Sequence, residues 1–194
     1  MSDFHLYGGL YRYVNLLYTP EVSFEQIKIT PSVDEKGRKG HLHIAASFYN
    51  PATISGQGTL SLIIKSPDGK VIHSKKQEQS FTGKAILVDM HISKPLLWDV
   101  DNPQLYSCEV TLEINGNSIH AVDRFGFRHF EFIEKGPFML NGNRVLLKGT
   151  HRHEDHAGLG AALTEELMIR EMQLIKDMGA NFIRLGHYQQ SDIV

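Results

Sequence analysis

The chain has 194 residues, of which 41% are hydrophobic and 22% charged, and its formal net charge at pH 7 is −2. This length allows one or two hydrophobic cores, and the near-neutral charge gives no electrostatic reason to expect nucleic acid or an anionic membrane as a partner. Neither a basic, apolar leader in the first residues nor a later run of eighteen apolar residues is found, so no signal peptide or transmembrane helix is expected here.

Two further features of composition bear on compartment and stability. Cys108 is the single cysteine, so no intrachain disulfide can form and packing must hold the core. Localisation stays open between cytoplasm and periplasm, because a leader encoded upstream would not be visible in these residues.

Residues 22–128 read as short strands in which apolar and polar residues alternate, separated by turn residues. This pattern is typical of antiparallel strands with one buried face, because side chains alternate with period two. The predicted inward faces are Leu42, Ile44, Ala46 and Phe48; Leu60, Leu62 and Ile64; Ile86, Val88, Met90 and Ile92; and Tyr106, Cys108, Val110, Leu112 and Ile114.

The pattern predicts about seven strands, the size of an immunoglobulin-like β-sandwich. Asn115-Gly116 predicts a tight hairpin after the strand that begins at Tyr106. Tyr106 precedes Cys108 by two residues, as in a tyrosine corner, so its hydroxyl is expected to bond an upstream backbone group.

After Arg128 the pattern changes to that of a β-α-β unit. Asn141-Gly142 predicts a hairpin that leads into a buried strand at residues 145–147. A helix is expected from the N-cap Thr164 to Gly179, with Met168, Met172 and Ile175 on one face, and a strand follows at residues 182–185. The fold class predicted for the chain is therefore mainly β, a sandwich followed by an incomplete (β/α) barrel segment.

Polar side chains follow both predicted parallel strands, where the reactive ends of such units lie. The first cluster is residues 150–156, and the second comprises Arg184, His187 and Tyr188. Three interpretations stay open from residue types and spacing. The cluster could be a solvated loop containing Arg152, Glu154 and Asp155, a sugar or polyol site, or a metal site built on His151 and His153 with His156 and His187.

Two long stretches, LNGNRVLLKGTHRHEDHAGLG and LTEELMIREMQLIKDMGANFIRLGHYQQ, resemble glycoside hydrolase family 2, and within it β-galactosidases more than β-glucuronidases or β-mannosidases. LYGGLYRYVNL resembles the end of that family's sugar-binding jelly roll, and PLLWDVDNPQLYSCEV resembles part of its immunoglobulin-like domain. The resemblance implies three parts: residues 1–20 as the tail of the jelly roll, 21–128 as the sandwich, and 129–194 as the first β-α-β portion of a (β/α)8 catalytic barrel.

The resemblance also implies a reaction. Family members hydrolyse glycosides with retention, using an acid/base and a nucleophile carboxylate about 5–5.5 Å apart. Both are Glu residues that follow the fourth and seventh barrel strands, so the resemblance implies no catalytic residue in this chain, which would be inactive alone. It implies substrate-binding roles for His153 and His187, which would contact the sugar, and for Arg184, which would orient a catalytic carboxylate.

The implied whole protein is a β-galactosidase whose partner is a β-galactoside and which forms a homo-oligomer. We expect no metal or other cofactor in this chain, while the resemblance allows a divalent or monovalent cation in the whole enzyme. Two alternatives remain: a non-catalytic carbohydrate-binding or scaffold sandwich, and a metal-dependent barrel hydrolase that uses the His-x-His pair.

Overall fold

The computed structural model describes residues 7–194. The chain divides into two compact units. One is Tyr18–Val145, and the other consists of Leu146–Val194 together with the segment that ends at Leu17. Of residues 1–20, expected to end a sugar-binding domain, residues 1–6 lie outside the described part, and that domain assignment stays a prediction.

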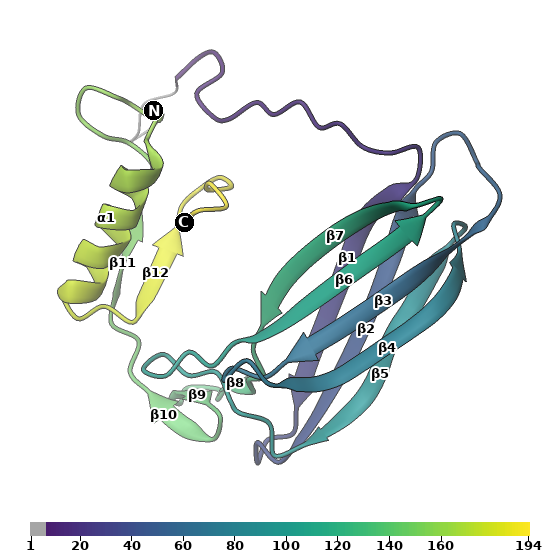
Figure 1. The fold of residues 1–194 in the computed structure, drawn as a ribbon. Helices are drawn as coiled ribbons and strands as arrows, with labels where there is room; N and C mark the ends of the chain where they lie inside the picture. Colours follow the sequence, from purple (N-terminus) through teal and green to yellow (C-terminus); the bar gives the residue numbers. More distant parts are fainter. Residues whose placement is uncertain (1–6) are drawn as a thin grey trace. The chain divides into compact units, whose positions relative to one another are not determined.

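Tyr18–Val145 contains a β-sandwich of two antiparallel sheets (Figure 1). One sheet has the strand order β1-β2-β5 and the other β4-β3-β6-β7, and the buried apolar residues of the sandwich form one cluster. This confirms the predicted fold class. The strands are β1 (Ser23–Val33), β2 (Lys39–Tyr49), β3 (Gln57–Lys65), β4 (Val71–Ser80), β5 (Lys84–Ser93), β6 (Tyr106–Ile114) and β7 (Asn117–Phe125).

The period-two predictions hold for β2, β3 and β6, whose burial alternates along the whole strand. Asn115 and Gly116 both have positive φ, 48° and 81°, and form the predicted tight turn between β6 and β7. The Tyr106 side chain is buried, and its hydroxyl accepts a hydrogen bond from the backbone N–H of Leu96 at 2.8 Å. The predicted tyrosine corner is therefore confirmed.

The inward face predicted for β5 is partly wrong. Ile86 is 58% exposed, whereas Ala85 and Leu87 are each 2% exposed. The pairing of β2 with β5 shifts between Ile44 and Ala45, so that Leu87 is an extra residue on β5. This β-bulge reverses the alternation, and the predicted face resumes only at Val88.

A small antiparallel sheet follows the sandwich, made of β8 (Phe130–Phe132), β9 (Phe138–Leu140) and β10 (Asn143–Val145). The hairpin at Asn141-Gly142 is confirmed, but the strand predicted at 145–147 is wrong. Val145 ends β10, and the side chains of Leu146 and Leu147 are 62% and 40% exposed. The hairpin uses Val145 for its own pairing, so the parallel strand begins later.

The β-α-β unit consists of β11 (Gly149–Arg152), α1 (Glu165–Asp177) and β12 (Phe182–Leu185), and β11 pairs with β12 in parallel as predicted. The Thr164 side chain caps α1 by accepting from the Leu167 N–H, Gly179 has φ +86° just past the helix end, and Met168 is the buried residue of the helix. Among the described residues, no helix is long and apolar enough to cross a membrane.

Candidate functional site

The carboxyl end of β11 carries polar side chains on two opposite faces. His151 is exposed and His153 half-buried, while the alternating residues Arg152 and Glu154 are 6% and 1% exposed. Extended backbone sends successive side chains to opposite sides. The sequence HRHE therefore builds an imidazole face and a buried charged face from adjacent residues.

The imidazole face brings together the three residues predicted to bind substrate. The rings of His153 and His187 lie with their centroids 5.1 Å apart at an interplanar angle of 72°, and Arg184 Nη2 donates a hydrogen bond to His187 Nδ1 at 3.1 Å. A guanidinium can only donate, so Nδ1 is the acceptor and the proton of a neutral His187 lies on Nε2. His187 thus presents a donor, the group that a sugar hydroxyl oxygen needs. The roles of these residues stay predictions.

An aromatic ring and a further histidine flank this group. The His151 ring lies 5.7 Å from that of His153, and the Tyr188 ring 6.2 Å from it. His151 is paired across the strands with Arg184. Three histidines, an arginine and a tyrosine at the ends of β11 and β12 suit a polyol, because they combine hydrogen-bond donors and acceptors with a flat apolar surface.

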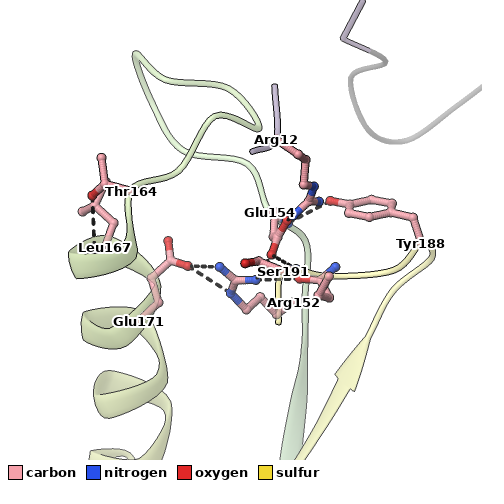
Figure 2. A network of polar contacts seen from close by, with 9 residues as sticks. Arg12, Arg152, Glu154, Thr164, Leu167, Glu171, Tyr188 and Ser191 are labelled. Atoms are coloured by element: carbon pink, nitrogen blue, oxygen red, sulfur yellow. Dashed lines mark hydrogen bonds and ion pairs between the residues drawn. The ribbon is translucent and has the colours of Figure 1, made fainter. Parts of the chain in front are cut away.

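The opposite face contains Arg152, whose guanidinium joins three segments of the unit (Figure 2). It donates to Glu171 on α1 from Nε at 2.9 Å and from Nη2 at 2.6 Å, and from Nη1 to the Gln190 side-chain oxygen at 2.6 Å. Arg152 Nη1 also lies 3.4 Å from Glu154 Oε1. The strand, the helix and the segment after β12 are thereby held together by one buried cation.

Glu154 is the second buried charge of this face. Its Oε1 accepts the N–H of Ser191 at 3.0 Å, its own N–H donates to the Tyr188 hydroxyl at 2.8 Å, and Oε2 forms an ion pair with Arg12 (Figure 2). The Arg12 guanidinium lies 5.8 Å from the centre of the Tyr188 ring. The carboxylate is therefore held between two guanidinium groups and bound to the segment that carries His187.

The solvated-loop interpretation is wrong for Arg152 and Glu154, and the sequence reasoning missed this network. The available signal was the continuation of period-two alternation through HRHE, which places two charges on the inner side of a strand. No comparable sequence pattern indicated Arg12, which lies more than a hundred residues earlier in the chain. Asp155 also has a distant partner, because the Tyr7 hydroxyl donates to it at 2.8 Å and this bond raises the pKa of Tyr7.

The histidines of the metal interpretation are not all in one place. His156 forms a bridge with Gly160 in a turn, where its Nδ1 donates to the carbonyl of Ala157 at 3.0 Å. Within residues 7–194, no group of three or more His, Cys, Asp or Glu side chains is arranged to hold a metal ion. The expectation that this chain uses no metal stays a prediction.

Comparison with known families covers most of the chain. Residues 22–128 match the family described as glycosyl hydrolases family 2, and residues 132–194 match its TIM barrel domain. The second match identifies the β-α-β unit as the start of a (β/α) barrel.

Three similar proteins are informative. A putative β-glucuronidase of Formosa agariphila is 41% identical over 97% of this chain and 23% of its own length, and a β-galactosidase of Vibrio vulnificus is 32% identical over 96% of this chain and 19% of its own. The crystal structure of Parabacteroides merdae β-glucuronidase with glycerol in the active site covers 99% of this chain and 24% of that one, at 53% identity and a TM-score of 0.95. The chain thus spans about a quarter or less of these relatives.

Proposed function

Because this chain belongs to glycosyl hydrolases family 2, we propose that the whole protein is a retaining β-glycosidase that binds its sugar with His153, His187 and Arg184. The observation that carries this proposal is the convergence of these three side chains at the ends of β11 and β12. The imidazoles supply hydrogen bonds to hydroxyl groups, and Arg184 supplies a fixed positive charge for a catalytic carboxylate. The two catalytic Glu residues of the family belong to later barrel strands.

We propose a β-glucuronide as the substrate class. The support comes from identity: the Formosa and Parabacteroides proteins, named β-glucuronidases, are 41% and 53% identical to this chain. A β-galactoside is the second candidate, favoured by the resemblance of the barrel motifs and by the Vibrio β-galactosidase at 32% identity. The two sugars differ in the configuration of the C4 hydroxyl and at C6, where the glucuronide has a carboxylate and the galactoside a hydroxymethyl group. A pocket with a cation beside C6 therefore prefers the glucuronide.

Paired substrates test the proposal. The whole protein is assayed with p-nitrophenyl β-glucuronide and p-nitrophenyl β-galactoside, and kcat/KM is expected to be at least about tenfold higher for the glucuronide. The reverse preference would favour the galactoside. Hydrolysis of neither, by protein that is folded, would contradict the assignment as a β-glycosidase of these two classes.

The site itself is tested by substitution. His153→Ala and His187→Ala are each expected to lower kcat/KM by about 100-fold or more, because they remove contacts that strengthen in the transition state. His156→Ala is the matched control, since that ring bonds the nearby Ala157 carbonyl in a turn, and its kcat/KM is expected to stay near the wild-type value. Equal losses in all three variants would argue against the proposed site.

A further inference from the structure

Glu154 is a buried carboxylate to which the proposed reaction gives no chemical task. Its side chain is held by the guanidinium groups of Arg12 and Arg152, and it is 1% exposed. We infer that Glu154 is a positioning residue of the sugar site, which fixes the segment 186–191 against β11 so that His153 and His187 face each other. This inference rests on the proposed function for its kinetic consequence, and on geometry alone for the positioning itself.

The bonds of Glu154 reach the two histidines through their neighbours. His153 directly precedes Glu154, whose N–H donates to the hydroxyl of Tyr188, the residue after His187. The carboxylate then accepts the N–H of Ser191, at the other end of the same segment. One residue therefore holds the 186–191 segment at two points, Tyr188 and Ser191.

The two arginines explain why a charge is tolerated in this place. A buried carboxylate is costly unless it is paired, and here Glu154 is paired with both guanidinium groups while its Oε1 also accepts the Ser191 N–H. Arg152 passes the constraint to α1 through Glu171 and to the segment through Gln190. The buried charged face therefore fixes the positions of the histidine rings on the imidazole face.

Loss of a positioning residue and loss of a residue that only stabilises the fold have different effects on kcat and KM. A misplacement of about 1 Å in a group that acts on the transition state can cost about 100-fold in rate, while ground-state binding changes less. Loss of Glu154 should therefore lower kcat much more than it raises KM. A residue that only stabilises the fold would lower the amount of active enzyme and the melting temperature, but would leave kcat per folded molecule unchanged.

The test uses the whole protein with two variants at Glu154. Glu154→Gln keeps an acceptor for Ser191 but removes the charge, and Glu154→Ala removes both. We expect kcat to fall by about tenfold and about 100-fold respectively, with KM within about threefold of wild type. The control Glu165→Gln, in the first turn of α1, should leave kcat and KM unchanged. If Glu154→Ala does not fold, Glu154→Gln decides, and a kcat within about twofold of wild type would overturn the inference.

Two further readouts complete the test. In Glu154→Gln, replacing Arg12 by Gln as well should recover kcat by at least about threefold, because the second change removes the charge left unpaired by the first. Amide hydrogen exchange should be faster in 186–191 of the Glu154 variants, while α1 stays protected. Equal loosening of α1 would mean general destabilisation and would overturn the inference.

Amide hydrogen exchange also distinguishes failure of the positioning role from failure of the proposed function. If the wild-type protein hydrolyses neither glycoside, the proposed function fails, and selective loosening of 186–191 still supports the positioning role. If amide hydrogen exchange becomes faster in neither 186–191 nor α1, the positioning role fails.

Discussion

At the scale of single residues, the hydroxyl of Tyr106 fixes the segment that leads into β6. It accepts the Leu96 N–H at 2.8 Å in a part-buried hydrogen bond, and Tyr106→Phe would leave that donor without its partner. A buried donor left unpaired costs about 1–3 kcal/mol, so the free energy of unfolding should fall by that amount in urea denaturation. Tyr49→Phe is the control, because Tyr49 is 47% exposed and its loss should be small. Equal losses of unfolding free energy in the two variants would contradict the tyrosine corner.

Cys108 lies in the same strand and illustrates how burial controls reactivity. Burial raises the pKa of its thiol to about 12, with Asp123 and Glu109 adding to the shift. At pH 9 the native thiol should therefore stay protonated and resist iodoacetamide, whereas the unfolded chain should react rapidly, because only the thiolate is nucleophilic. Peptide mass spectrometry of the Cys108 adduct with and without urea measures this. Rapid labelling of native protein would contradict the burial.

The residues of the candidate site differ in how far sequence could predict them. His153, His187 and Arg184 were found because family resemblance marks positions that spacing alone leaves among three interpretations. Arg152 and Glu154 were assigned to solvent in one of these interpretations, since charged residues are usually exposed unless they are paired. Their partner Arg12 lies too far away in sequence for any local pattern to connect them.

At the scale of elements, the bulge in β5 decides which of two adjacent apolar residues enters the core. Leu87 is 2% exposed and Ile86 is 58% exposed, although strict alternation placed Ile86 inside. Leu87→Ala should lower the free energy of unfolding by about 2–5 kcal/mol, and Ile86→Ala by no more than about 1 kcal/mol. Urea denaturation of both variants measures the difference. The opposite order would show that the register has no shift there.

Strands β11 and β10 show why boundaries were harder to predict than element types. Val145-Leu146-Leu147 is the most apolar run of this region, so local pattern favoured it as the barrel strand. The parallel strand is instead Gly149–Arg152, whose residues carry little apolar signal, and its place is set by pairing with β12. The Asn181 side chain bonds the backbone of Leu146 and Lys148 and thereby fixes the preceding connection. Such long-range pairing is invisible in a local window.

At the scale of the whole molecule, the metal interpretation makes a thermal prediction. If His151, His153 and His187 bound zinc, ligand linkage would raise the melting temperature with added zinc and a chelator would lower it. We expect neither shift, because Arg184 donates to His187 Nδ1 and places a cation beside the histidines. Differential scanning calorimetry with zinc and with EDTA tests this. A higher melting temperature with zinc together with a lower one with EDTA would restore the metal interpretation.

We also predict that the 194-residue chain alone does not hydrolyse either chromogenic glycoside. Its buried carboxylate Glu154 is neutralised by two arginines, and Asp155 accepts a bond from Tyr7. Both carboxylates are therefore engaged by other side chains, and we expect neither to act as a nucleophile or an acid/base group. A steady-state assay of repurified chain measures this. Turnover that disappears in Glu165→Gln would show that a catalytic carboxylate lies within these residues.

The apolar surface of the β-α-β unit leads to a last prediction, for self-association. Leu174 on α1 and the C-cap residue Met178 are 57% and 62% exposed, and on β12 Phe182 and Leu185 are 47% and 46% exposed. Exposed apolar groups of this size favour contact with another surface. The purified 194-residue chain should therefore associate more as its concentration rises, which sedimentation velocity measures. Leu174→Gln with Met178→Gln should weaken the association, whereas Val122→Thr, an equally exposed apolar site on β7, should leave it unchanged. A monomer at all concentrations would contradict this prediction, and equal weakening by Val122→Thr would place the contact on the sandwich instead.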